Sequence, residues 1–162
     1  MEEKEEPRIQ GESSAALKKA LALLERCEQC RAGLERKLVQ KGFSKNVVAG
    51  ILDALEETGF LSDSRFARAW LNSRRIGRYE GRTRLLAELA ARGISKEISK
   101  KAVDDFFEEF DEDEICAKAA QKFLSLGFSG QKFFSAMTRA GFSYKQASQF
   151  ANLKAIEAAG DF

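Results

Sequence analysis

The sequence contains no histidine and a single proline, and each shortage excludes a class of protein. Without histidine the chain lacks the commonest general base and the commonest metal ligand, which argues against an enzyme and a metal centre. One proline in 162 residues is far fewer than turn-rich β architectures use. The composition therefore predicts an all-α protein that has no cofactor and no enzymatic activity.

Cysteine is also scarce, and its three positions are Cys27, Cys30 and Cys116. The number is odd, and the chain shows neither a signal peptide nor an apolar run long enough to span a membrane. We therefore expect a cytoplasmic protein in a reducing compartment. Cys27 and Cys30 have the C-x-x-C spacing of half a zinc site, but no second half follows, which favours two thiols at a helix junction.

An internal repeat is the most informative feature that is present. A glycine, a large apolar residue and a serine follow one another three times, beginning at Gly42, Gly93 and Gly141. Apolar residues recur in register eight positions before each glycine, at Leu34, Leu85 and Phe133. A period of about 50 residues indicates stacked copies of one supersecondary unit.

Apolar periodicity divides each repeat into three helices, so the predicted fold is all-α, with three tandem three-helix repeats in an elongated, solenoid-like stack of helix-turn-helix-like units. The expected divisions are an acidic, disordered tail at 1–13, repeats at 14–60, 61–110 and 111–156, and a frayed C-terminus at 157–162. We expect a monomer, because each unit packs mainly on its neighbour.

Local signals define the repeat boundaries. Each glycine supplies the left-handed residue that ends a helix, and the serine after it is expected to cap the next helix. In the middle repeat Ser62 is expected to cap a helix in which Phe66 and Trp70 share one face. We interpret these two aromatic side chains as core residues rather than as a platform for stacking bases.

Charge is strongly polarised along the chain, although the formal net charge is only +2. Seven arginines and one acid lie between positions 65 and 84, whereas the stretch 104–114 holds eight acids and no base. Arginine suits bidentate pairing with carboxylates or phosphates. The candidate binding residues are therefore the polar positions of this basic segment: Arg65, Arg68, Asn72, Arg74, Arg75, Arg78, Arg82 and Arg84.

A specific motif begins at Gly59 and runs Gly-Phe-Leu-Ser-Asp-Ser-Arg-Phe-Ala-Arg-Ala-Trp. The motif continues as far as Ile94 with an arginine pair, two glycines, Leu-Leu-Ala-Glu-Leu and Arg-Gly-Ile. In this combination, and in the weaker repeats on both sides, the sequence resembles the bacterial RecX family from Ser14 to about Leu153. Cys30 departs from the pattern, because the family usually starts its second helix with serine or threonine.

The resemblance implies a non-enzymatic regulator of RecA. Such a protein lodges along the groove of the RecA filament on single-stranded DNA and restrains strand exchange and ATP hydrolysis. The partner of the arginines is then an acidic protein groove, the DNA backbone, or both. The family pattern gives no role for the acidic stretch 104–114.

A tandem helix-turn-helix DNA-binding protein is the alternative, since residues 38–48 look like the turn of such a motif. A recognition helix needs exposed polar or basic residues to reach base edges. The helix after Ser44 offers only Lys45 and Asn46 before it becomes apolar, and the helix after Ser95 ends in acids that repel phosphate. The turns are therefore better explained as repeat architecture.

Overall fold

The computed structural model describes residues 6–151, and within this range the chain forms nine helices and no strand. The first three are α1 (Glu6–Leu24), α2 (Arg31–Gln40) and α3 (Lys45–Glu57). The middle three are α4 (Asp63–Arg74), α5 (Arg82–Ala90) and α6 (Lys96–Glu109). The last three are α7 (Glu112–Ser125), α8 (Gly130–Arg139) and α9 (Tyr144–Ser148). The predicted all-α class is confirmed.

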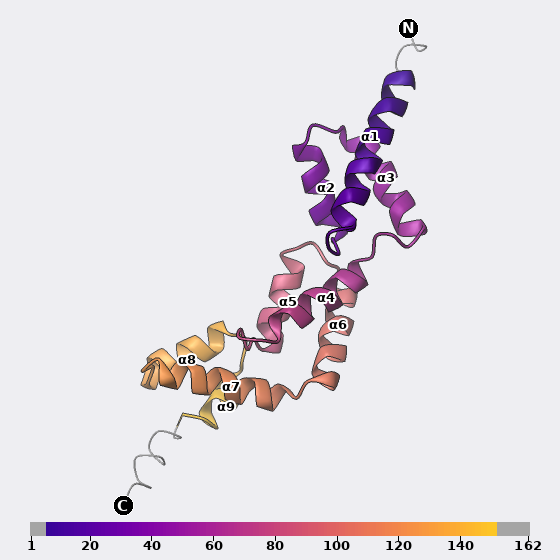
Figure 1. The fold of residues 1–162 in the computed structure, drawn as a ribbon. Coiled ribbons are helices and arrows are strands. Elements are labelled where there is room, and N and C mark those ends of the chain that lie inside the picture. Colours follow the sequence, from indigo (N-terminus) through magenta and orange to yellow (C-terminus); the bar gives the residue numbers. More distant parts are fainter. Residues whose placement is uncertain (1–5, 152–162) are drawn as a thin grey trace, which may run out of the picture.

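The three trios of helices follow one another along an elongated molecule, with α1 and α9 near opposite ends (Figure 1). The most extensive helix contacts lie within each trio, for example between α1 and α3, between α4 and α6, and between α7 and α8. The chain is therefore a row of small bundles, and each bundle presents side faces that no other bundle covers.

The predicted disordered tail is wrong for residues 6–13, because α1 begins at Glu6. The carboxylate of Glu12 accepts a hydrogen bond from the backbone N–H of Ser44, which ties α1 to the start of α3. Residues 1–5, the end of the third repeat after 151 and the predicted frayed segment 157–162 lie outside the described range.

The repeated turns have the predicted geometry. Gly42, Gly93 and Gly141 have φ values of +93°, +84° and +98°, in the left-handed region that side chains with a Cβ rarely adopt. The serine two residues later stands at the N-cap in all three repeats. Ser95 accepts a hydrogen bond from the amide of Ile98, and Ser143 forms a capping box with Gln146. At Ser44 the side chain makes no such bond.

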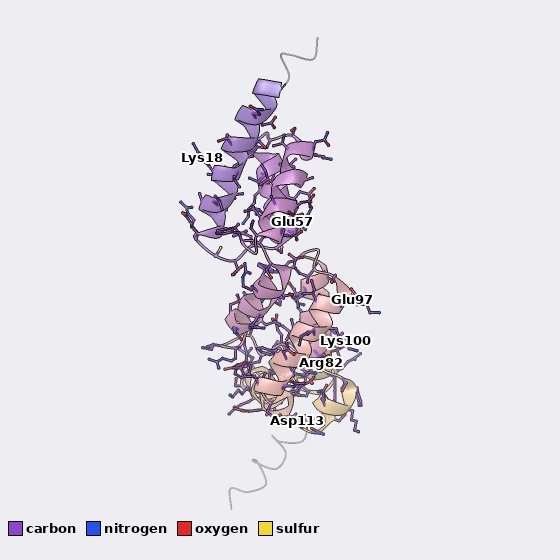
Figure 2. All side chains as sticks on the ribbon, turned by 90° about the vertical axis from the view of Figure 1, so that its right-hand side faces the viewer. Lys18, Glu57, Arg82, Glu97, Lys100 and Asp113 are labelled. Carbon is purple, nitrogen blue, oxygen red and sulfur yellow. The ribbon has the colours of Figure 1, made fainter. Side chains whose placement is uncertain are left out.

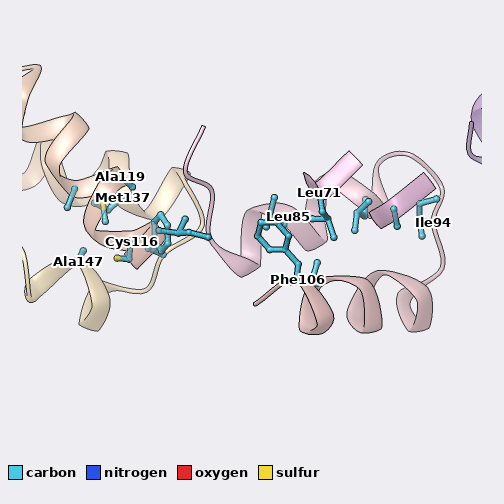
Figure 3. Packing of buried hydrophobic residues seen from close by; sticks show 14 of the residues in the cluster. Leu71, Leu85, Ile94, Phe106, Cys116, Ala119, Met137 and Ala147 are labelled. Atoms are coloured by element: carbon cyan, nitrogen blue, oxygen red, sulfur yellow. The ribbon is translucent and has the colours of Figure 1, made fainter. Parts of the chain in front are cut away.

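Two apolar clusters hold the described part of the chain together. One lies in the first trio, with Leu34, Leu38, Val48 and Leu52 among its buried residues, and it also includes Leu61 from the segment before α4. The other runs through both remaining trios without a break, from Ile94 at one end to Ala147 at the other (Figure 3). The middle and last repeats therefore share a core, to which the first repeat contributes Cys30, whereas the other buried apolar residues of the first repeat form a core of their own.

The last residue before the second helix of one repeat contacts the turn of the next repeat. The amide of Gly81, just before α5, donates a 2.8 Å hydrogen bond to the carbonyl of Ala140. The contact requires glycine, since a Cβ on residue 81 would lie 2.6 Å from the carbonyl oxygen of Gly141. Cys30, just before α2, approaches the turn at Gly93 in the same way, with its Sγ 3.5 Å from the carbonyl oxygen of Arg92.

Candidate partner-binding face of the middle repeat

Helix α4 and its C-cap residue Arg75 position five of the eight predicted binding residues. Ser62 caps the helix by accepting a hydrogen bond from the amide of Arg65 at 3.3 Å, and Ala67 and Leu71 form its buried side. The remaining face is polar and exposed, and it carries the residues of the predicted stripe: Arg65, Arg68, Asn72 and Arg75. The helical spacing of the sequence thus separates these four side chains from the core.

Four of the seven predicted arginines are already paired with acids inside the chain. Arg74 has only 12% of its side chain exposed and lies between Glu80 at 3.6 Å and Glu88 at 3.5 Å. Arg84 pairs with the same two carboxylates. These two arginines therefore stabilise the middle repeat. Their anionic partners are carboxylates of the same repeat, Glu80 inside the basic segment 65–84 and Glu88 just after it.

Glu88 is the centre of this ion-pair network. Its carboxylate contacts Arg74, Arg84 and Arg92, with Arg92 at 2.8 Å. The hydrogen bond from Arg92 is the main cause that holds the pKa of Glu88 below its ordinary value, and the three positive charges add to it. Sequence reasoning missed Glu88, although its spacing of four residues from both Arg84 and Arg92 is the signal of helical ion pairs.

Trp70 lies between two of these arginines. The guanidinium carbons of Arg74 and Arg92 lie 4.5 Å and 4.6 Å from the centre of its ring, which is the geometry of cation–π contacts. Trp70 and Phe66 are half-buried and pack against the shared core. They serve the core as predicted, but part of each side chain still reaches the surface.

Arg82 and Arg65 link the middle repeat to other parts of the chain. Arg82 pairs with Asp104 on α6 and lies 3.5 Å from Glu112, the first residue of α7. Its guanidinium also covers the ring of Phe107 at 4.9 Å. Arg65 pairs with Glu28 of the first repeat at 2.9 Å. Part of the acidic stretch 104–114 thus has a structural role, because it balances Arg82.

Helix capping explains more of that acidic stretch. Asp111 caps α7 by accepting a hydrogen bond from the amide of Asp113, and Glu112, Asp113 and Glu114 occupy the first turn, where carboxylates are favourable. Asp105 pairs with Lys101, and Glu114 with Lys118. Figure 2 shows Arg82 below Glu97 and Lys100 of α6, and Asp113 of α7 lower still.

Three of the predicted arginines are exposed and have no acidic partner within the described residues: Arg68, Arg75 and Arg78. Arg75 lies 4.7 Å from the ring centre of Phe110, which fixes its guanidinium at the surface. Arg68 and Asn72 stand on the rim of a cavity of about 290 Å³ between α4 and α6. We call Arg68, Asn72, Arg75 and Arg78 the open basic face; Arg78, in the turn after α4, borders a separate hollow with Glu80, Arg84 and Arg139.

The cavity beside Arg68 has an apolar floor and a rim of both charges. Leu71, Ile98, Ala102 and Phe106 form much of its lining, and Glu97, Lys101, Asp105 and Glu109 surround it. Three acids close to Arg68 disfavour a phosphate chain at this point, since like charges repel. A protein segment with apolar side chains and both kinds of charge fits this groove better.

Within residues 6–151, none of the helices has the length and apolar character that a bilayer crossing needs. In the same range, no three side chains of the metal-ligating types histidine, cysteine, aspartate and glutamate come together as a candidate metal site. What the described range presents is a row of helical faces with one partly free basic surface, which is suited to contact with a macromolecule.

Comparison with known proteins agrees with this architecture. Residues 16–55 match the first three-helix domain of RecX, and residues 62–103 match its second three-helix domain. The regulatory protein RecX of Treponema pallidum (strain Nichols) is 37% identical over 124 residues, which span 76% of each chain. That of Mycolicibacterium vanbaalenii is 35% identical over 96 residues, 59% of this chain and 51% of the relative.

Two solved structures share the fold. The crystal structure of RecX from Lactobacillus salivarius superposes with a TM-score of 0.73 at 17% identity, and covers 91% of this chain and 98% of its own. A second crystal structure, of a regulatory protein RecX, superposes with a TM-score of 0.76 at 19% identity, and covers 93% and 77%. The likeness extends over all three trios of helices.

Proposed function

The chain belongs to the RecX family of regulatory proteins, and from that premise we propose that it binds the RecA filament on single-stranded DNA and restrains the recombinase and ATPase activities of RecA. The open basic face is the proposed contact. The observation that supports it most is that Arg68, Arg75 and Arg78 are exposed on one repeat. Other arginines of the same segment, such as Arg74 and Arg84, are paired with acids inside the chain.

The shape of the molecule suits a filament better than a compact ligand. Three bundles in a row give a long surface that can contact several subunits of a polymer, and repeat proteins commonly bind along such surfaces. The groove between α4 and α6, with its apolar floor and mixed charges, is suited to a protein segment. Charge complementarity at the open basic face would then speed capture and fix the register.

The helix-turn-helix alternative is less well supported by the exposed faces of α3 and α6. Beyond Lys45 and Asn46, the exposed charged residues of α3 are the acids Asp53, Glu56 and Glu57. Helix α6 exposes Lys96, Lys100 and Lys101, but acids occupy its second half. Neither helix therefore offers the continuous basic or polar surface that base-edge contacts in a major groove need.

The test compares two triple variants of the full chain. Arg68→Glu, Arg75→Glu and Arg78→Glu reverse the open basic face, whereas Lys18→Glu, Arg26→Glu and Arg36→Glu reverse three exposed charges of the first repeat as a matched control. Co-sedimentation with RecA, with and without single-stranded DNA and nucleotide, reports binding, and the RecA ATPase rate reports inhibition.

We expect the first variant to lose at least about tenfold in inhibitory potency, since reversing charges at a complementary interface replaces attraction by repulsion. The control variant should inhibit like the natural chain. Binding of bare single-stranded DNA is measured in parallel. If the first variant loses only DNA binding and still inhibits RecA fully, the open basic face is a nucleic-acid contact and the proposed filament contact is wrong.

A further inference from the structure

Both junctions between repeats use the same position. One partner is the N-cap residue of a repeat's second helix. The other is a backbone carbonyl in the next repeat, on the residue just before that repeat's turn glycine. Cys30 contacts Arg92 through its Sγ, and Gly81 contacts Ala140 through its amide. Each N-cap residue lies 12 positions before its own repeat's turn glycine, and so does Ser129, the N-cap residue of α8.

A second link accompanies each junction. The first residue of the second helix contacts an acid that begins the following repeat. The amide of Arg31 donates to the Oδ1 of Asp63 at 2.7 Å, and the side chain of Arg82 lies 3.5 Å from Glu112. Asp63 lies 30 positions before Gly93 and Glu112 lies 29 positions before Gly141, and Glu12 lies 30 positions before Gly42. The first repeat thus carries an acid at the corresponding place.

The receiving side of this junction is open in the first repeat. A Cβ added at Gly93 would lie 2.7 Å from Ala32, and one at Gly141 would lie 2.5 Å from the amide of Arg84. At Gly42 nothing lies within 4 Å, and Lys41 and Gly42 are exposed. The α1 helix, which continues past Glu12, therefore leaves the turn glycine uncovered.

The donating side is open in the third repeat. Ser129 is exposed, and its hydroxyl does not bond to the start of α8, which leaves it available as a donor. Gly130 follows it, and a Cβ added there would meet nothing within 4 Å. The first repeat therefore has an uncovered turn, and the third repeat has an uncovered helix start. These are the two parts that contact each other at both internal junctions.

We propose that copies of this chain contact one another head to tail, with the start of α8 of one copy on the Gly42 turn of the next. In this contact the Ser129 hydroxyl donates to the carbonyl of Lys41, and the amide of Gly130 donates to Glu12. Glu12 already accepts one bond from Ser44, but a carboxylate has room for about four donors.

The proposal rests on the proposed function for its setting. A single helix start on a single turn is far smaller than the interface of about 1,200 to 2,000 Å² that a stable complex needs. Free copies should therefore separate, and copies bound side by side on a polymer should join because their effective concentration is high. The contact is heterologous and does not close, so it extends along a track rather than forming a ring.

Cysteine cross-linking tests the contact. Lys41→Cys and Ser129→Cys are placed in separate chains, each with Cys27→Ser to remove the exposed native thiol. The two variants are mixed, oxidised mildly on RecA filaments and also at high concentration without filaments, and resolved under non-reducing conditions. We expect a disulfide-linked pair from the mixture on filaments and none from either variant alone.

Ser135→Cys provides the matched control, because it is also exposed on α8 but lies more than one turn beyond Ser129. Mixed with Lys41→Cys, it should cross-link at least about fivefold less, since a disulfide needs Cα atoms within about 7 Å. A chain that carries both Lys41→Cys and Ser129→Cys should give a ladder of multimers.

Co-sedimentation of the same samples separates the two proposals. Binding to filaments without a cross-link from the mixture overturns the head-to-tail contact and leaves the proposed function intact. Failure to bind filaments counts against the proposed function. In that case the concentrated mixture without filaments tests the contact, and the absence of a cross-link there overturns the head-to-tail contact. A cross-link that appears only after removal of residues 1–11 also overturns it, because α1 would then be a cap that keeps copies apart.

Discussion

The carboxylate of Asp63 accepts a 2.7 Å hydrogen bond from the backbone amide of Arg31, so the first residue of α4 caps α2 of the preceding repeat. Cysteine at position 30 cannot perform this task, because it makes no cap bond to its own helix. A helix start that would otherwise fray is thus completed by a residue 32 positions later in the chain.

Replacing Asp63 with alanine should cost about 1 to 2 kcal/mol of stability, the usual value of a lost helix cap. Asparagine at the same position retains an acceptor and should cost less. Urea denaturation followed by circular dichroism measures both changes. Equal stability of Asp63→Ala and the natural chain would show that the bond between Asp63 and Arg31 contributes nothing.

A comparison of Gly42 with Gly141 separates the free energy of the contact between repeats from the cost of a positive φ in the turn. Both have positive φ, so alanine is strained at each by about 1 to 2 kcal/mol. At Gly141 the new methyl group would also lie 2.5 Å from the backbone of Arg84, whereas at Gly42 it meets open space. We expect Gly141→Ala to destabilise the chain by at least about 2 kcal/mol more than Gly42→Ala, the usual scale of overpacking.

The same chemical denaturation series decides this comparison. Similar losses for the two glycine variants would mean that the contact between the α5 start and the third repeat relaxes at little cost.

The three thiols should differ sharply in reactivity. Cys27 is exposed and Cys116 is buried, and burial, helped by the carboxylates of Asp113 and Glu112, raises the pKa of the Cys116 thiol to about 11. The thiolate is the reactive form, so at about pH 8 Cys116 should be inert. Titration with Ellman's reagent should find one fast thiol in the folded chain and three in denaturant. Cys27→Ser should abolish the fast phase.

Glu88 should make stability depend on acidity. Its pKa is depressed in the folded chain, so its contribution is present above the ordinary value of 4.5 and is lost as pH falls through the lower folded value. At neutral pH Glu88→Gln should cost about 1 to 3 kcal/mol, because hydrogen bonds to charged partners are lost. The two chains should converge in stability as pH falls through the lowered pKa of Glu88 in the folded chain. A cost that stays constant across the acid range would show that the Glu88 charge is unimportant.

The repeats and their turns were predictable because their signals are local. A glycine that ends a helix, a serine that caps the next and apolar residues at helical spacing all lie within a few residues of one another. For this reason the turns at Gly42, Gly93 and Gly141 were found from the sequence. The start of α1 was not, because the sequence before Ser14 shows no periodic apolar face, and the bond that ties Glu12 to Ser44 joins residues 32 positions apart.

The candidate site was predictable only in part, for the same physical reason. Helical spacing identified the polar face of α4, but it could not show which arginines are already occupied. Arg65 pairs with Glu28, 37 positions away, and Arg82 with Asp104, 22 positions away. Such pairs depend on how the helices pack, and a charge count over a window of sequence does not contain that information.

The division of the core has a mechanical consequence. An apolar core shared by the middle and last repeats resists shear and bending, because any rotation would expose apolar surface to water. The first repeat contributes Cys30 to that core and is otherwise joined to it by polar contacts, such as those of Arg31 with Asp63 and of Arg65 with Glu28. We therefore expect any bending of the described chain to concentrate at the junction between the first and middle repeats.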